Sequence, residues 1–151
     1  MEMPSDDLLK GRVSRAGQTY HITTTTEGRI PLFRDFTMAR LVIAEMRRLH
    51  EQNLLHSIAW VLMPDHLHWL LQLNGPVAIS TVIKVLKGRS SRQLSLRRPG
   101  SQPIWQKGFH DHALRREEDI RKVARYIVAN PLRAGLVEQI GDYPLWDAQW
   151  L

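Results

Sequence analysis

The sequence predicts an α/β protein of the α+β class, in which helices flank an antiparallel sheet. Two apolar segments, residues 56–63 and 66–73, are separated only by Pro64-Asp65. Proline presets the backbone of a tight turn and aspartate tolerates the next position, so the two segments should pair as an antiparallel hairpin. Three other segments repeat apolar residues every three or four positions, as amphipathic helices do. A chain of 151 residues can bury the core of one domain, which we expect over residues 1–151.

Before the hairpin, the sequence predicts a flexible lead, a strand and a helix. The lead covers residues 1–17. Residues 20–26 read Tyr-His-Ile and four threonines, a composition that favours a strand. Asp35 is a candidate cap for a helix that runs to about Asn53. The expected core face of that helix consists of Met38, Leu41, Val42, Met46 and Leu49.

The hairpin is expected at the centre of the sheet, because both faces of its first strand are apolar. One face should carry Ile58, Trp60 and Leu62, and the other Ala59, Val61 and Met63. In the second strand, Leu67, Trp69, Leu71 and Leu73 form one face, whereas the other begins with His66 and His68. Same-face neighbours lie about 6 to 7 Å apart, so both imidazoles can reach one metal ion. A pair of polar side chains on a solvated face is the simpler alternative. Asp65 could orient a metal-bound ring or serve only the turn.

After Asn74-Gly75-Pro76, helical spacing resumes at Ile79, and we expect Gly88 to kink or end that helix. Residues 97–103 should form a mobile loop and residues 105–115 an edge strand, which carries a second His-x-His, His110 and His112. Three carboxylates at residues 117–119 favour the start of another helix. Its expected core positions are Ile120, Val123, Ala124 and Ile127. An aromatic tail over residues 141–151 should pack on the core or stack on bases.

The basic residues are concentrated in one segment. The net charge is +6, but between His66 and His110 there is no Asp or Glu. This segment contributes seven cations, Lys84, Lys87, Arg89, Arg92, Arg97, Arg98 and Lys107. A positive block in an otherwise balanced domain favours a polyanionic partner, with nucleic acid first. Arg12 and Arg15 in the lead are further candidates for phosphate contacts. A solvated basic face is the alternative.

The composition also indicates in which cellular compartment the protein is expected. The chain has no cysteine, so it offers neither disulfides nor thiolate ligands, and a reducing compartment is the natural home. Its start is acidic and polar, and no apolar run approaches the ~18 residues of a membrane span. We therefore expect a cytoplasmic protein that does not interact with a membrane.

Tyr126 and Asn130 lie one turn apart on the predicted helix, so a phenol and an amide point the same way. Together with two imidazoles and a cationic track, they fit metal-assisted transfer of a phosphodiester onto tyrosine. Of the three tyrosines, Tyr20 falls in a strand and Tyr143 in a turn, which leaves Tyr126 as the candidate nucleophile. The alternatives are a packing role for Tyr126 and a helix-capping role for Asn130.

Two blocks of residues, 61–68 (VLMPDHLH) and 125–137 (RYIVANPLRAGLV), with Trp105-Gln106 between them, resemble the REP-associated tyrosine transposases. These belong to the wider HUH class, named for histidine, hydrophobic residue, histidine. The resemblance covers about residues 19–146. It implies a ferredoxin-like sandwich, a site for Mg²⁺ or Mn²⁺, and nicking and joining of single-stranded DNA at hairpins of repetitive extragenic palindromes.

By position, the resemblance makes His66 and His68 metal ligands and Tyr126 the nucleophile. Related enzymes have a glutamine where this chain has Asn130, so the shorter amide is the candidate third ligand. The resemblance leaves open whether the protein is a monomer or a homodimer with shared sites.

Two other functions are compatible with the sequence. A non-catalytic nucleic-acid-binding module would keep the basic track on the same fold. A metal-dependent hydrolase would use His66, His68, His110 and His112 with water as the nucleophile. Replacing Tyr126 separates both from the transferase.

Overall fold

The protein is built on a five-stranded antiparallel sheet with the strand order β4-β1-β3-β2-β5. A computed structural model describes residues 17–100 and 102–149. The strands are β1 (Thr19–Thr25), β2 (Leu55–Met63), β3 (His66–Leu73), β4 (His110–Leu114) and β5 (Trp146–Ala148). The helices are α2 (Phe36–Glu51), α3 (Ile79–Ser95), α4 (Glu117–Val128) and α5 (Asn130–Arg133). Three short 3-10 turns complete the described elements, at Glu27–Arg29, Leu32–Arg34 and Ile140–Asp142.

The first six strands and helices, β1-α2-β2-β3-α3-β4, form a ferredoxin-like unit. Two β-α-β halves interleave so that β1 and β3 are central, β2 flanks β3 and β4 flanks β1. This confirms the expected fold and the central hairpin of β2 and β3. β5 extends the sheet beyond β2, and the sequence reading did not predict it as a strand.

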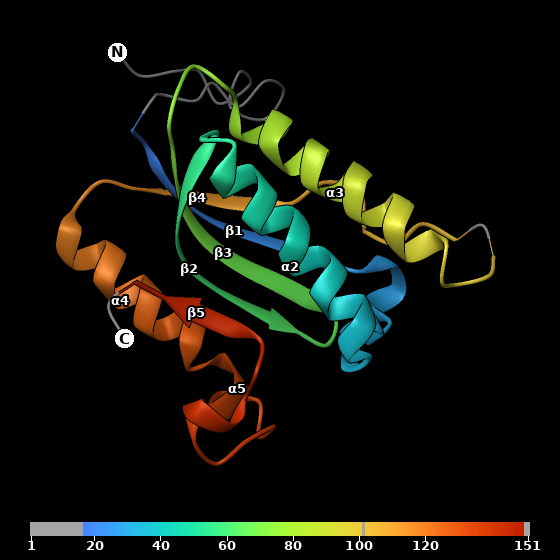
Figure 1. Cartoon of the computed structure of the whole chain (residues 1–151). Helices are drawn as coiled ribbons and strands as arrows, with labels where there is room; N and C mark the ends of the chain where they lie inside the picture. The colour runs from blue at the N-terminus through green and yellow to red at the C-terminus, as the bar shows by residue number, and fades with distance from the viewer. Residues whose placement is uncertain (1–16, 101, 150–151) are drawn as a thin grey trace.

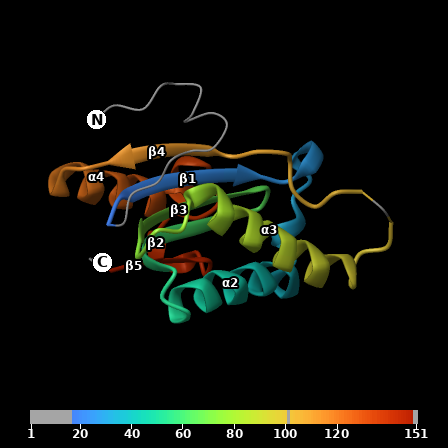
Figure 2. The same cartoon turned by 90° about the horizontal axis from the view of Figure 1, so that it is seen from above.

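Helices cover the sheet on both faces. α2 and α3 lie side by side on one face, whereas α4 lies on the other (Figures 1 and 2). Leu67, Trp69 and Leu71 of β3 belong to the larger core under α2 and α3. Leu70 belongs to the second core, under α4. The predicted alternation of β3 is therefore confirmed, and His66 and His68 share the face of Leu70.

The expected cap of α2 is confirmed. The carboxylate of Asp35 accepts hydrogen bonds from the backbone N–H groups of Thr37 at 2.9 Å and Met38 at 3.3 Å. These bonds satisfy two of the four N–H groups that a helix start leaves unpaired. Met38, Val42, Met46 and Leu49 are buried as predicted, and Leu41 packs against the same core.

The prediction that Gly88 ends or kinks its helix is wrong. α3 runs through this residue to Ser95. A glycine costs a helix about 1 kcal/mol relative to alanine, but Leu86, Ser90 and Leu94 are buried on either side of it. Tertiary packing of this face stabilises the helix across the glycine.

The predicted faces of β2 are wrong at its beginning. The register with β3 shifts between Ser57 and Ala59. Ile58 and Ala59 consequently both pack in the core under α4, whereas Ile58 was expected to share a face with Trp60 and Leu62. A bulge adds one residue to a strand and reverses the alternation on one side of it, and the apolar run of β2 gives no sign of where it lies.

Residues 1–16 of the predicted lead, with Arg12 and Arg15, and Trp150 of the tail lie outside the described residues. Within the tail, half-buried Trp146 packs against the core under α4, and its indole N–H donates to the carbonyl of Ile140 at 3.1 Å. This supports packing rather than base stacking for that tryptophan. None of the helices in residues 17–100 and 102–149 is both long and apolar enough to cross a membrane.

Candidate active site

The paired histidines of β3 lie on the face of the sheet that α4 partly covers. Their ring centroids are 5.0 Å apart and the planes are nearly perpendicular, at 84°. β3 is a central strand that pairs with β1 on one side and β2 on the other. The two imidazoles are therefore held by a rigid part of the fold, as the alternation of the strand predicted.

Asp65 holds the ring of His66. Its carboxylate oxygen lies 2.7 Å from Nδ1 of His66, and its second oxygen accepts from Nε of Arg29 at 3.1 Å. Partial burial raises the pKa of this carboxyl, but the hydrogen bond and charge of His66, together with Arg29, hold the pKa below its usual value. A carboxylate at Nδ1 leaves Nε2 of His66 as the nitrogen that can bind an ion.

His68 is held through its own Nδ1 by two side chains of β1. Nε2 of His21 lies 3.0 Å from that atom, and Oγ1 of Thr23 lies 3.1 Å from it. Burial and then the charges of His66, His21 and Arg133 lower the pKa of His68 from 6.5 to about 3. At neutral pH the ring is uncharged, which is the form that binds metals.

His21 is a residue of this site that the sequence reading missed. Tyr20, Ile22 and Thr24 are buried, so period two places His21 and Thr23 together on the opposite face of β1. That signal was present in the sequence. Its partner could not be read, because contact with His68 depends on the register between β1 and β3.

Asn130 does not cap α5. Ala129 occupies the N-cap position, and the side-chain amide of Asn130 donates to the carbonyl of Ile127 at 3.2 Å. The same carbonyl, in the last turn of α4, also accepts from the backbone N–H of Ala129 at the helix end. Since the amide nitrogen is engaged, its oxygen is the atom that remains for a ligand role.

His66, His68 and Asn130 offer nitrogen and oxygen ligands, which fit a divalent ion that accepts both. In the described part of the chain, no three His, Cys, Asp or Glu side chains gather closely enough to hold an ion by themselves. His66 and His68 would supply two Nε2 atoms, so further ligands would be oxygens, from Asn130, water or a phosphate. Imidazole with oxygen ligands suits Mn²⁺ better than Mg²⁺, which prefers oxygen alone.

The three tyrosines have different environments. Tyr20 is buried, with 7% of its surface exposed. Tyr143 donates its hydroxyl to the carbonyl of Leu62 at 2.7 Å, and burial raises its pKa to about 12. Tyr126 is 52% exposed, and its ring stands edge-on to His68 with centroids 6.4 Å apart. α4 thus brings the predicted nucleophile to the paired histidines of its own chain.

Arg133 is a second residue of the site that the sequence reading missed. Its guanidinium carbon lies 3.9 Å above the Tyr126 ring, and Nη2 donates to the backbone carbonyl of Tyr126 at 2.6 Å. α5 follows α4 after a sharp turn and brings this cation back to the tyrosine. The guanidinium therefore stacks on the face of the Tyr126 ring as a cation–π contact.

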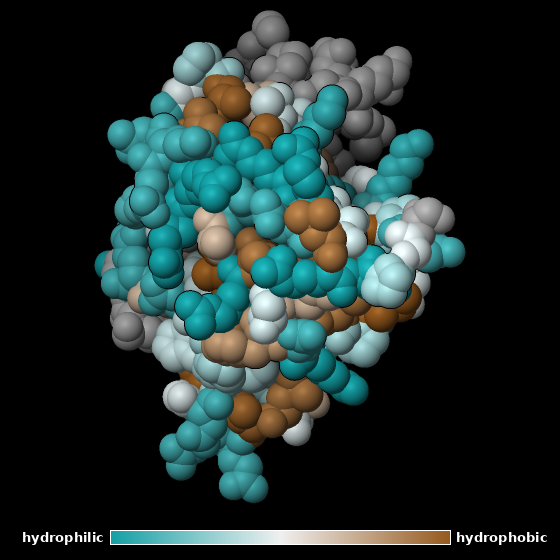
Figure 3. Space-filling model, turned by 45° about the vertical axis from the view of Figure 1, so that its right-hand side comes forward, coloured by the Kyte–Doolittle hydropathy of each residue, from teal (hydrophilic) through white to brown (hydrophobic). Residues whose placement is uncertain are grey.

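The predicted DNA-binding residues are distributed over α3 and the segment that follows it. A groove of about 790 Å³ runs between α3 and residues 102–109, and Lys84, Lys87 and Lys107 line it. Hydrophilic side chains predominate over much of the molecular face in Figure 3. Nη1 of Arg89 donates to Oε1 of Gln52, the residue that follows α2, at 3.4 Å. Arg92 and Arg97 are exposed and Arg98 is half-buried.

Lys87 also has a structural contact. Its ammonium donates to the carbonyls of Gln106 at 2.9 Å and Gly108, and burial lowers its pKa. Lys87 therefore fastens the segment before β4 onto α3. Lys84 and Lys107 are the exposed cations of the groove.

The second His-x-His lies apart from the first. His110 and His112 are exposed on β4, and β1 separates that strand from β3. His112 pairs with His21 in the register of β1 and β4. Because no trio of ligating side chains is found over the described residues, the four-histidine hydrolase site receives no support.

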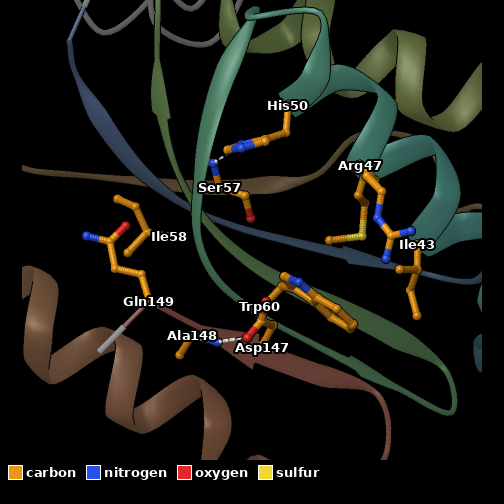
Figure 4. A pocket seen from close by; sticks show the side chains of 10 residues that line it. Ile43, Arg47, His50, Ser57, Ile58, Trp60, Asp147, Ala148 and Gln149 are labelled. Carbon is orange, nitrogen blue, oxygen red and sulfur yellow. Dashed lines mark hydrogen bonds between the residues drawn. The ribbon is translucent and has the colours of Figure 1, made fainter. Parts of the chain in front are cut away.

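A cavity of about 260 Å³ opens between α2 and the β2–β5 edge (Figure 4). Arg47, His50, Trp60 and Asp147 are among its lining residues, and His50 accepts from the backbone N–H of Ser57 at 3.0 Å. None of the predicted site residues lines this cavity. The paired histidines and Tyr126 belong to a different part of the surface.

A ferredoxin-like sheet with paired histidines, and a tyrosine presented to them by a following helix, defines a single-tyrosine transposase of the histidine–hydrophobic–histidine type. The family described as "Transposase IS200 like" matches residues 14–130, so the chain belongs to that family. This confirms the resemblance found in the sequence.

Relatives within the family carry more specific names. The chain is 33% identical over 87 residues to the REP-associated tyrosine transposase of Escherichia coli (strain K12), over 57% of this chain and 50% of the relative. It is 30% identical over 116 residues to a putative REP-associated tyrosine transposase of Haemophilus influenzae, and the match covers 68% of this chain and 66% of that relative. The chain therefore spans about half to two thirds of the length of these relatives.

Solved structures show the same fold. One is a REP-associated tyrosine transposase bound to a REP hairpin, with a TM-score of 0.75, 26% identity, and coverage of 87% of this chain and 77% of that one. Another is a putative transposase from Deinococcus radiodurans, with a TM-score of 0.57 and 27% identity. The match covers 78% of this chain and 94% of that one.

Proposed function

We propose that this protein nicks and rejoins single-stranded hairpin DNA through a covalent phosphotyrosine at Tyr126, with Mn²⁺ or Mg²⁺ held by His66, His68 and the amide oxygen of Asn130. The observation that carries the proposal is the position of Tyr126. Of the tyrosines, it alone combines an exposed ring with contact to the paired histidines. Tyr20 is buried and the hydroxyl of Tyr143 is engaged.

The chain's own residues divide the reaction between them. The Tyr126 oxygen forms a bond to the phosphorus, loses its proton to solvent, and displaces a DNA oxygen that leaves with a proton as a hydroxyl. Arg133 lies against the face of the Tyr126 ring and hydrogen-bonds the backbone carbonyl of the same residue, so it helps to hold the ring in place. The bound ion would offset the negative charge that grows on the phosphate.

Rejoining follows from the same geometry. The phosphotyrosine keeps a phosphodiester bond of comparable energy, so attack by the hydroxyl of another DNA end restores a DNA linkage and releases Tyr126. Water would give only hydrolysis. This distinguishes a strand transferase from a nuclease.

The proposed partner is hairpin DNA of the kind found in repetitive extragenic palindromes. A related solved structure is bound to a REP hairpin, and the exposed Lys84 and Lys107 line a groove beside α3. Arg89, Arg92, Arg97 and Arg98 extend the same cationic segment. The lack of cysteine favours a cytoplasmic location.

The test is to incubate the protein with a labelled REP-type hairpin and Mn²⁺, and to look for a protein–DNA adduct that survives denaturation. We expect the adduct with the unchanged protein and with Tyr143→Phe. We expect none with Tyr126→Phe. A cleaved hairpin without an adduct would instead indicate a hydrolase, and tight binding without cleavage a non-catalytic binding module.

A further inference from the structure

The neighbour of His68 in β1 is in a position to control which nitrogen His68 presents. Nε2 of His21 and Nδ1 of His68 are 3.0 Å apart, a hydrogen-bond distance. The ring centroids lie 5.2 Å apart with a 33° tilt. His21 is half-buried between His68 of β3 and His112 of β4.

A neutral imidazole carries its proton on one nitrogen and accepts on the other. His68 can use Nε2 as a metal ligand only if the proton is on Nδ1. In that tautomer Nδ1 donates, and Nε2 of His21 lies where the acceptor must be, provided that His21 carries its own proton on Nδ1. In the opposite tautomer His68 accepts at Nδ1 and its Nε2 carries a proton, which prevents ligation.

Thr23 by itself does not select the tautomer. Its hydroxyl, 3.1 Å from the same Nδ1, can accept from Nδ1–H or donate to an unprotonated Nδ1. The hydroxyl therefore fits either form of His68. An acceptor at His21 favours only the form that ligates through Nε2.

We propose that His21 is a positioning residue for the metal site, which accepts the Nδ1 proton of His68 and thereby fixes the tautomer that presents Nε2 to the ion. The inference rests on the proposed metal-dependent function. It parallels the contact of Asp65 with His66, so each histidine of the pair has its own partner at Nδ1. The purely structural alternative is that His21 only fills space between β3 and β4.

The experiment measures Mn²⁺ binding to the metal-free protein by titration calorimetry, without DNA. His21→Phe keeps a flat ring but has no acceptor, and we expect Mn²⁺ affinity to fall by about 10- to 100-fold, the usual effect of losing a partner of a metal ligand. His21→Gln restores an acceptor oxygen and should stay within a few fold of the unchanged protein. His56→Gln on β2 makes the same chemical change outside the site and should bind like the unchanged protein.

A second readout observes the ring directly. ¹⁵N NMR of His68 should show the Nδ1–H tautomer in the unchanged protein, and a shift toward Nε2–H in His21→Phe. If His21→Phe does not fold, His21→Leu serves in both measurements.

The outcomes separate the two proposals. A folded His21→Phe or His21→Leu that binds Mn²⁺ as tightly as the unchanged protein would overturn the role of His21 while leaving the metal site intact. An equal loss in His21→Phe and His21→Gln would also overturn it, because the acceptor would then be irrelevant. No Mn²⁺ binding by the unchanged protein would refute the metal site itself, and an Nε2–H tautomer of His68 in that protein would refute the positioning role independently.

Discussion

Acid should destabilise the metal-free protein through His68. The ring is neutral in the folded chain because burial and neighbouring charges lower its pKa from 6.5 to about 3. Below pH 6.5 the unfolded chain takes up a proton here that the folded chain does not, so the free energy of unfolding falls as the pH falls. The effect is absent well above pH 6.5 and grows until the pH reaches the folded pKa.

The magnitude follows from the two pKa values. A pH of 5 lies about 1.5 units below the unfolded pKa of 6.5, so the unfolded ring is protonated there and the folded ring is not. At ~1.36 kcal/mol per pH unit, this difference lowers the free energy of unfolding by roughly 2 kcal/mol. For a domain of this size that is a fall of about 4 to 8 °C in melting temperature. His21, whose pKa is also lowered by burial and by the charge of His112, adds to the loss in the same direction.

Urea unfolding in the presence of EDTA at pH 7, 6 and 5 measures the loss. His68→Gln has no titrating ring and should lose correspondingly less stability between pH 7 and pH 5. His56→Gln, on the neighbouring strand, should lose as much as the unchanged protein. A His68→Gln variant with an undiminished acid loss would show that the neutral state of His68 is not what the folded structure enforces.

Further predictions concern the fold around α3 and the groove. Ser90→Ala removes the acceptor of the buried Trp105 indole N–H, which now bonds to Oγ at 2.9 Å, so the free energy of unfolding should fall by about 1 to 3 kcal/mol in urea titrations. Ser91→Ala, at a half-buried position beside the groove, should change it by less than about 0.5 kcal/mol, and equal losses would contradict this reading of Ser90. Hairpin affinity should fall steeply with salt, and replacing Lys84 and Lys107 by Gln should lower the log–log slope by roughly 1 to 2. An unchanged slope would exclude the groove lysines from phosphate contact.

The β2–β3 hairpin and the faces of β3 could be predicted because alternation and turn chemistry are local. A side chain's face is fixed by period two, so separating His66 and His68 from Leu67 and Trp69 needed no knowledge of the rest of the fold. The cap at Asp35 is equally local. Each of these confirmed predictions depended on residues within a few positions of one another.

The features that could not be predicted from the sequence depend on contacts between distant segments. The bulge before Ala59 and the strand β5 are set by how β2 packs and pairs, and neither has a local signal. His21 and Arg133 reach the site because of sheet register and the turn between α4 and α5. The prediction for Gly88 fails for the same reason, because the low helix propensity of glycine is outweighed by the packing of α3 on the core.

Tyr126 and the paired histidines meet within one polypeptide. The ring centroids of Tyr126 and His68 of the same chain are 6.4 Å apart. A variant that lacks the Tyr126 hydroxyl and a variant that lacks the imidazoles of His66 and His68 should therefore not restore activity when they are mixed. Activity should likewise rise in simple proportion to the amount of protein, with no threshold at high dilution. On this geometry we expect that a second copy of the chain cannot supply the group that either variant lacks.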